Sequence, residues 1–235
     1  PYALTAVAEG YADYAWEARG GGYSDTVTQE GGKLFEKRLA VARQWLEKAG
    51  PKRKSYPRWY SAASTIALGE GWDAEKFDAT MDEGIKLFPT YYTLHFDRVY
   101  HLQPRWYGKE GDWEAYAAKA DDQIGGEDGD MLYARIIWYV NRKRVLYKKN
   151  TIFSKSNVSW VRTARGFDLL AAKYNDAPDV LNAYARLAVA ASDVEKAKKL
   201  FAKIGAEVTM EPWATTESNA RNYFLKCRMW AFGKQ

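Results

Sequence analysis

The sequence predicts an all-α fold in which antiparallel helix pairs stack on one another and a final helix caps the end of the stack. Three observations lead to this prediction. Apolar residues recur at helical spacing along most of the 235 residues. Glycine, proline and short polar runs interrupt this spacing in the way that is typical of helix ends. No stretch shows sustained alternation of apolar and polar residues with many β-branched side chains, so we expect no β-sheet.

The clearest helix pair runs from Asp176 to Gly205, with a tight turn at residues 191–193. Small residues stand where the two helices approach each other, and large apolar residues fill the space between them. The small residues are Ala183, Ala185, Ala188 and Ala197, and the large ones are Leu181, Tyr184, Leu187, Leu200, Phe201 and Ile204. One hairpin cannot bury such a face alone, so we expect similar hairpins beside it.

Start and stop signals divide the first half of the chain. Three consecutive glycines end the first helix, and a Gly-Pro pair ends the second. Thr28 caps the second helix and Asp73 the fourth, because their side chains can accept hydrogen bonds from N–H groups of the first turn. Pro57 suits the first turn of the third helix, and Pro89 stops the fourth. The expected helices are 2–19, 28–49, 57–68, 73–88 and 91–102, with a basic loop at 52–54.

The second half follows the same logic. Asp112 caps a helix that a glycine-rich polar run ends, and Asp130 begins the next one. Asn157 or Ser159 caps the helix before the clearest pair, and Thr216 caps the last helix of the chain. The expected helices are 113–124, 130–147, 160–174 and 216–232, which with the clearest pair make about eleven. We expect all of 1–235 to form one helical repeat domain, within which 1–125 and 126–235 are candidate sub-blocks.

The net charge of +5 is modest but unevenly distributed. Residues 61–130 include 6 basic and 15 acidic side chains, whereas residues 131–165 include 9 basic and no acidic ones. Such blocks either pair with each other across neighbouring helices or face a charged partner. Internal pairing is the favoured interpretation, and both stay open at this point.

Residues of reactive type are better explained by structure than by catalysis. Cys227 is the only cysteine, which excludes an internal disulfide, and its apolar neighbours predict a buried thiol. Asp97 and His101 are four residues apart on one helix, and we expect a hydrogen-bonded structural histidine there. Metal binding by His95 and Asp97 is disfavoured, and we expect neither a metal nor a cofactor. The acidic pairs at 82–83 and 112–114 suit helix starts or solvated faces.

Two segments are candidates for ligand contact. Arg19 lies one turn after Trp16 and precedes the three glycines, so it either bonds carbonyls at the helix end, which is favoured, or contacts a ligand. The loop after residue 102 is longer than a simple repeat turn and contains Arg105 and Trp106. This guanidinium could bind a carboxylate while the indole stacks on a ligand. The favoured alternative is that Trp106 fills the gap left by the long turn.

The clearest pair resembles a tetratricopeptide repeat (TPR). The residues that support the resemblance are Leu181, Tyr184, Ala185 and Ala188, then Ala197, Phe201 and Ile204. A partial second match consists of Leu68, Phe77, Met81, Gly84 and Pro89, and departs from the pattern at Phe77, where a small residue is expected. The stretches AWEARGGGY at 15–23, LQPRWYG at 102–108 and ARI at 134–136 are similar to bacterial TPR-like proteins in a domain-of-unknown-function family. These resemblances imply a right-handed α-solenoid of TPR-like pairs and a bacterial origin, but no activity.

In TPR-like stacks the first helices of the pairs line a concave groove that commonly binds peptides. Arg135, Trp138 and Arg142 share one face of a helix, and Asn182 and Arg186 share one face of the next pair. The predicted partner-binding residues are Arg135, Trp138, Arg142, Asn182 and Arg186, with Arg105 and Trp106 in the long loop. An open groove of this kind requires that Arg135, Trp138, Asn182 and Arg186 be exposed.

Together these patterns predict a non-enzymatic scaffold or adaptor of bacterial origin that binds a protein or peptide. The alternative is a small-molecule receptor or an enzyme with a pocket near Arg19, His95, Arg105 and Trp106. The two hypotheses differ in geometry, because the first needs an open groove and the second a closed pocket with converging polar groups.

Other partners and locations are less favoured. The basic clusters at 52–58 and 142–149 contain aromatic residues, but the acidic block between them disfavours nucleic-acid binding. No apolar run reaches the length of a membrane span. A cytoplasmic location is favoured, and a periplasmic one would follow if a signal peptide preceded Pro1. The sequence leaves the oligomeric state open.

Overall fold

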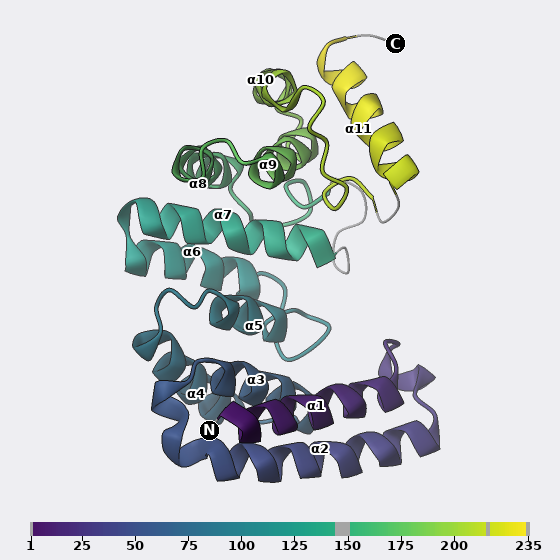
Figure 1. Ribbon diagram of the computed structural model, residues 1–235, viewed down its shortest axis with the longest axis vertical. Helices are drawn as coiled ribbons and strands as arrows, with labels where there is room; N and C mark the ends of the chain where they lie inside the picture. Colours follow the sequence, from purple (N-terminus) through teal and green to yellow (C-terminus); the bar gives the residue numbers. More distant parts are fainter. Residues whose placement is uncertain (1, 144–150, 215–216, 234–235) are drawn as a thin grey trace. The chain divides into compact units, whose positions relative to one another are not determined.

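The computed structural model describes residues 2–143, 151–214 and 217–233, and every regular element in these ranges is helical (Figure 1). Helices account for 75% of the structure, with eleven α-helices and two short 3-10 helices and no strand in the described ranges. The prediction of an all-α fold is therefore confirmed.

The chain folds as two compact units, Pro1–Lys109 and Glu110–Gln235. Their boundary lies before the helix that begins at Asp112, whereas the sequence placed a candidate boundary after that helix. The single repeat domain over 1–235 stays a prediction.

The first unit is built around α1, α2 and α3. Its elements are α1 (Tyr2–Arg19), η1 (Ser24–Thr26), α2 (Gln29–Ala49), η2 (Gly50–Ser55), α3 (Arg58–Glu70), α4 (Ala74–Leu87) and α5 (Thr93–His101). As predicted, Thr28 accepts a hydrogen bond from the backbone N–H of Gly31, and Asp73 accepts one from that of Lys76. These caps fix where α2 and α4 begin.

Small residues let α1 lie close to its neighbours. Its buried stripe, together with that of α2 and α3, consists of Ala8, Ala12, Ala15, Leu39, Ala42, Leu46, Ala62, Ala63 and Ile66. A Cβ added to Gly31 would lie 2.6 Å from the carbonyl oxygen of Ala18, so the two backbones touch there. A second cluster joins α3, α4 and α5 through Tyr60, Ala67, Phe77, Met81 and Leu94.

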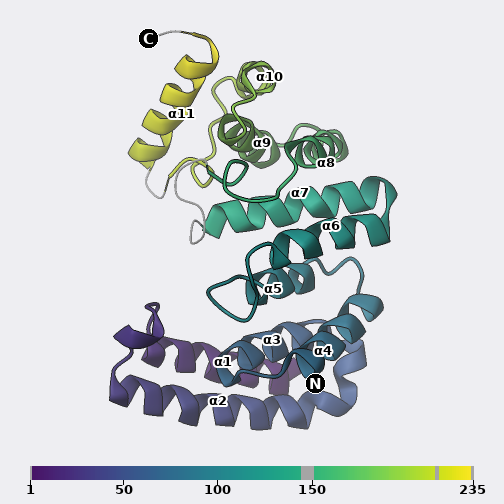
Figure 2. The same cartoon turned by 180° about the vertical axis from the view of Figure 1, so that it is seen from behind.

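The second unit stacks six helices (Figures 1 and 2). They are α6 (Asp112–Ile124), α7 (Gly126–Lys143), α8 (Trp160–Lys173), α9 (Pro178–Ala190), α10 (Val194–Ile204) and α11 (Glu217–Ala231). The contact between α7 and α8 is close, because a Cβ on Gly166 would lie 2.0 Å from the carbonyl oxygen of Asp130. Every residue from 181 to 190 is buried, so this part of α9 is enclosed on all sides.

The structure corrects several details of the sequence-based elements. The loop that follows the three glycines at 20–22 contains a 3-10 helix, and so does the basic loop at 52–54. Helix α7 begins at Gly126 instead of Asp130, with Glu127 and Asp128 in its first turn. The consecutive helices expected at 91–102 and 113–124 do not pack as one antiparallel pair, because α5 packs on α3 and α4 of the first unit while α6 packs on α7 of the second. The predicted helix end at 144–147 and the cap Thr216 lie outside the described residues.

Candidate functional site

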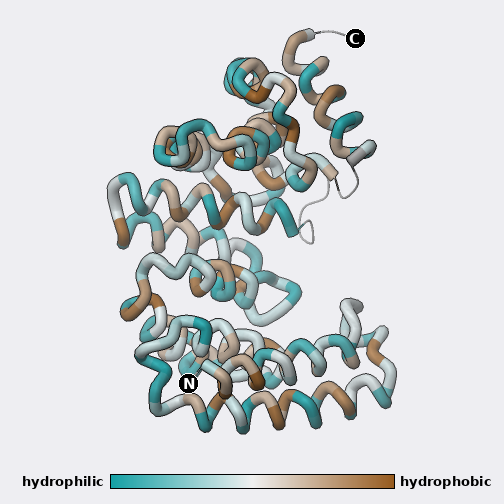
Figure 3. Tube along the Cα trace, in the orientation of Figure 1, coloured by the Kyte–Doolittle hydropathy of each residue, from teal (hydrophilic) through white to brown (hydrophobic). Residues whose placement is uncertain are grey.

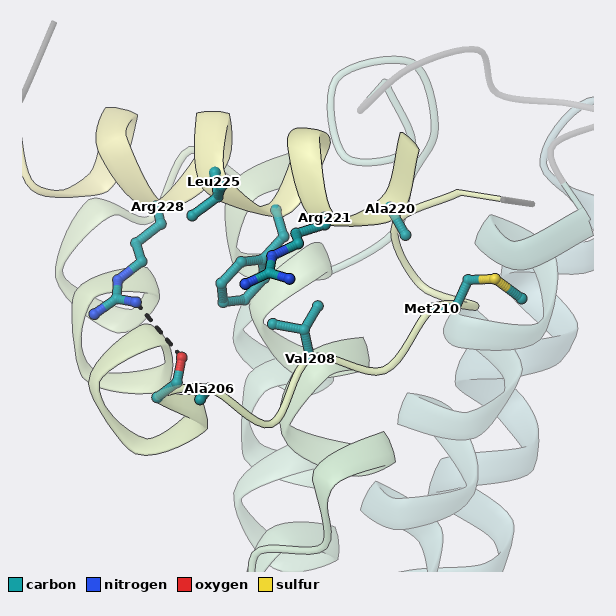
Figure 4. Close-up of a pocket in the computed structure, with 9 residues that line it drawn as sticks. Ala206, Val208, Met210, Ala220, Arg221, Leu225 and Arg228 are labelled. Atoms are coloured by element: carbon teal, nitrogen blue, oxygen red, sulfur yellow. Dashed lines mark hydrogen bonds between the residues drawn. The ribbon is translucent and has the colours of Figure 1, made fainter. Parts of the chain in front are cut away.

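A pocket of about 360 Å³ lies in the second unit, between α11 and the loop that follows α10 (Figure 4). Its lining residues are Gly205, Ala206, Val208, Met210, Ala220, Arg221, Phe224, Leu225 and Arg228. Figure 4 shows Arg221 and Arg228 reaching from α11 toward the loop segment that contains Ala206 and Val208. The pocket therefore combines an apolar interior with two guanidinium groups.

Helix α11 forms one wall, and apolar residues recur along its length (Figure 3). One stripe, Ala220, Phe224, Cys227 and Ala231, is buried against the rest of the unit. Three further large apolar side chains of the helix stay exposed to solvent, Leu225 by 43% and Met229 and Trp230 by 42% each, and Phe232 just after the helix is exposed by 42%. Since no described residue covers these side chains, this second face is available for contact.

The opposite wall is the loop at residues 205–214, and buried side chains hold it in place. Gly205 ends α10 with a φ of 56°, a conformation that favours glycine. The side chain of Asn182 donates to the carbonyl oxygen of Glu207 at 2.9 Å and accepts from the indole N–H of Trp213 at 2.8 Å. The rings of Trp213 and Phe224 meet edge to face, with centroids 5.2 Å apart. The loop and α11 are thus fixed to one another.

The pocket has a basic and apolar character. Arg221 and Arg228 are seven residues apart, which places both on one face of α11. Arg228 donates to the carbonyl oxygen of Gly205 at 3.5 Å, and neither arginine forms an ion pair with a residue that the structure describes. The lining contains no acidic side chain. An occupant with an apolar group and a negative charge would suit it.

Two predicted partner-binding residues, Asn182 and Arg186, are buried beneath the walls of this pocket. Asn182 is 0% exposed and Arg186 is 6% exposed, so the expectation that both are exposed is wrong. The guanidinium of Arg186 lies 5.4 Å from the ring centre of Tyr223 on α11. The reason is that the loop at 205–214 and α11 cover this face of α9. Both side chains support the walls of the pocket.

The predicted residues on α7 remain near the surface. Arg135 and Trp138 are half-buried, and Arg142 is exposed. Arg135 donates to the hydroxyl of Tyr174 at 2.9 Å. Arg142 forms an ion pair with Glu211, at 3.5 Å, next to the pocket residue Met210. Their role in partner binding stays a prediction.

In the first unit, three residues of the alternative site come together. The guanidinium carbon of Arg19 lies 6.0 Å from the ring centre of Trp106, and that of Arg105 lies 4.9 Å from it. Arg19 also bonds the carbonyl oxygens of Gly20 and Gly22, which is the interaction favoured from the sequence.

The two histidines are buried. Burial lowers the pKa of His95 from its usual 6.5 to about 4, and does the same for His101. The ring of His101 stacks between those of Phe77 and Tyr107, at 3.6 and 4.7 Å. The structure therefore gives His101 a packing role, through ring contacts.

Other groups considered from the sequence also have structural roles. Asp82 pairs with Arg98, and Glu83 accepts from Arg53 and from the hydroxyl of Tyr60. Cys227 is a buried free thiol, as predicted, and burial raises its pKa. Across the described residues, no group of three or more histidine, cysteine, aspartate or glutamate side chains is arranged to hold a metal ion. No helix in these ranges is long and apolar enough to cross a bilayer.

The acidic and basic blocks pair within the second unit. Arg162 lies 2.6 Å from a carboxylate oxygen of Asp121 and 2.5 Å from one of Asp122. Arg165 forms an ion pair with Asp130. These contacts join α8 to α6 and α7, so the favoured interpretation of the charge blocks is confirmed for these residues. The part of the basic block at 144–150 lies outside the described residues.

The pocket was missed in the sequence because its walls come from a loop and a helix whose contact is not visible there. A signal was nevertheless present. Leu225, Met229 and Trp230 fall outside the stripe that a single buried face of α11 needs. Arg221 and Arg228 recur at two-turn spacing on the same helix.

Comparison with protein-family models gives no match for this chain, and comparisons with curated proteins and with solved structures likewise give none. The resemblance to TPR proteins and to a bacterial family therefore stays a prediction.

Proposed function

We propose that this protein is a non-enzymatic helical scaffold that binds a protein or peptide partner. The pocket beside α11 would receive an apolar side chain of that partner, flanked by acidic residues. The observation that supports this proposal is the combination of a 360 Å³ pocket, exposed apolar side chains on α11 and two arginines without an acidic partner among the described residues.

Size and chemistry favour binding of a side chain. Pockets for drug-sized ligands range from about 300 to 1,000 Å³, so this one lies at the small end, suited to one large side chain. The exposed face of α11 beside it adds apolar area, and apolar burial drives most association. Arg221 and Arg228 favour acidic residues on either side of the inserted group.

The lining argues against catalysis at this pocket. General acid–base or nucleophilic chemistry needs side chains such as histidine, cysteine, serine, lysine or a carboxylate. None of these lines the pocket. A binding role needs only the shape, apolar area and charge that are present.

The wider surface fits the same proposal. Arg142, through its ion pair with Glu211, links α7 to the loop that forms the pocket wall. Arg135 and Trp138 would extend the contact along α7. A right-handed TPR-like solenoid of bacterial origin remains the architecture that the sequence resemblance supports.

The test is a selection of binders from a random peptide library displayed on phage, with the full chain as bait. Selected peptides should share an aromatic or aliphatic residue next to Asp or Glu. Binding of a synthetic copy should weaken about tenfold in Arg221→Glu, since one attraction becomes a repulsion. Lys226→Glu is the matched control, because Lys226 is exposed on the same helix but does not line the pocket.

Two results would contradict the proposal. One is a selection that enriches no peptide over a bead-only control. The other is equal weakening by Arg221→Glu and Lys226→Glu, which would show that only the overall charge matters.

A further inference from the structure

Five residues of the first unit form a cluster where the end of α1 meets the loop after α5. We call Trp16, Arg19, Tyr23, Arg105 and Trp106 the Arg–Trp cluster. The rings of Trp16 and Trp106 meet edge to face, with centroids 5.6 Å apart. All five belong to Pro1–Lys109, so the cluster is formed within one compact unit.

The cluster concentrates positive charge. Both guanidinium carbons lie within 6.0 Å of the Trp106 ring centre, and that of Arg105 is also 5.6 Å from the Tyr23 ring centre. Neither Arg19 nor Arg105 forms an ion pair with any residue in the described ranges. Elsewhere in this unit, Arg43, Arg53, Arg58 and Arg98 pair with acidic side chains, whereas Arg38 donates to the carbonyl oxygen of Tyr14.

The cluster also contains three buried hydrogen-bond donors that lack an acceptor among the described residues. They are the Nε of Arg105 and the indole Nε1 of Trp16 and of Trp106. Buried donors in folded proteins are nearly always paired. Two indole donors beside two guanidinium groups, one of which has a buried Nε without an acceptor, leave a shortage of acceptors and of negative charge in this cluster.

We propose that the Arg–Trp cluster binds a small ligand through an oxyanion, either a carboxylate or a phosphate. The oxyanion would accept from Arg105 and from at least one indole N–H, and would balance the two guanidinium charges. The guanidinium of Arg105 also contacts the rings of Tyr23 and Trp106 through cation–π interactions.

The loop that follows Arg19 is open to solvent. Residues 20–26 are all exposed, and a Cβ added to Gly20 or Gly21 would have no other heavy atom within 4 Å. This proposal rests on the first unit alone and does not depend on the peptide pocket beside α11.

The experiment is an NMR titration of the full chain that follows the indole Nε1–H signals. Trp16→Phe and Trp106→Phe identify the two signals among the ten tryptophans. The probes are inorganic phosphate, phenyl phosphate, acetate and benzoate, each compared with sodium chloride at equal ionic strength. We expect saturable shifts of the Trp16 or Trp106 signal with at least one probe, and the phosphate and carboxylate arms show which oxyanion is preferred.

Arg105→Gln should weaken this binding by about tenfold or more, because it removes a charge-assisted donor pair. Arg38→Gln is the matched control. Its guanidinium also stacks on a ring, 3.2 Å from the centre of Tyr14, and the substitution changes the charge equally. Binding should be unchanged in this variant.

The proposal is overturned if none of the four probes gives a saturable shift beyond that of sodium chloride. Equal affinity in wild type and Arg105→Gln would also overturn it. If the spectrum shows that Arg105→Gln does not fold, Arg19→Gln and Arg105→Lys replace it, and each is expected to weaken binding.

Discussion

The two units accommodate buried polar side chains in different ways. In the second unit, Asn182 is fully enclosed, and its amide donates to two carbonyl oxygens and accepts from Trp213. In the first unit, His101 is also buried, but neither of its ring nitrogens has a hydrogen-bond partner among the described residues. Its ring is held by stacking between Phe77 and Tyr107.

The comparison shows two uses of a buried polar side chain. Asn182 holds the loop at 205–214 through hydrogen bonds, whereas His101 contributes ring packing. A hydrogen-bonded amide fixes the partners it bonds, and its contacts do not change with pH. A stacked imidazole without hydrogen bonds is stable only while neutral, because burial disfavours its charged form. The stability of the second unit should therefore depend on the hydrogen bonds of Asn182, and the stability of the first unit should change with pH through its buried histidines.

Among single substitutions, the largest expected effect is the loss of the Asn182 side chain. Asn182→Ala would leave the indole N–H of Trp213 and the carbonyl of Glu207 buried without their present partner. We expect the free energy of unfolding of the second unit to fall by about 3 kcal/mol, measured by urea titration. Faster proteolysis within 205–214 should accompany it, since the pocket wall loses its anchor.

The control for this change is Asn222→Ala. Asn222 is exposed on α11, and its removal should alter the free energy of unfolding by less than about 0.5 kcal/mol. Similar effects of the two substitutions would show that Asn182 does not anchor the loop.

A second effect, which grows gradually as pH falls, should appear on acidification of the first unit. The pKa of His95 and of His101 is about 4 in the folded chain, against a usual 6.5. Between these values the unfolded chain binds protons that the folded chain does not. Stability is therefore fully present above pH 6.5 and falls as pH decreases toward 4, by about 1.4 kcal/mol per histidine and pH unit.

Urea unfolding at several pH values, followed by hydrogen exchange of peptides from α3 and α5, measures this slope. His101→Phe keeps the ring stack and removes one titrating group, so it should reduce the slope by about half. An unchanged slope in this variant would contradict the role given to His101. In the second unit, burial raises the pKa of Asp121, so protonation of this group favours the folded state and acts in the opposite direction.

Much of the helical structure follows from local sequence. The caps at Thr28 and Asp73, the glycine stop after Arg19 and the turn before α10 are short-range signals, and the structure agrees with them. The short 3-10 helices at Ser24–Thr26 and Gly50–Ser55 were not predicted, because three to six residues show no periodicity. The division between α5 and α6 depends on packing, which helical spacing does not specify.

The candidate site was only partly predictable for the same reason. Asn182 and Arg186 have the four-residue spacing of a surface face, and their burial comes from a loop and a helix that lie later in the chain. The sequence analysis therefore identified residues close to the pocket. It predicted that they face a partner, whereas they are buried beneath the pocket walls. Arg221 and Leu225 stay exposed on α11 and line the pocket, and helical spacing in the sequence does not show which face of this helix remains exposed.

The most direct test of the partner-binding pocket is a charge exchange with a selected peptide. Replacing the acidic residue beside its apolar anchor by Lys should weaken binding to the wild-type chain about tenfold. The same Lys peptide should bind Arg221→Glu more tightly than the original peptide does, while Lys226→Glu should keep the wild-type preference. A Lys peptide that binds wild type and Arg221→Glu with equal affinity would contradict the account.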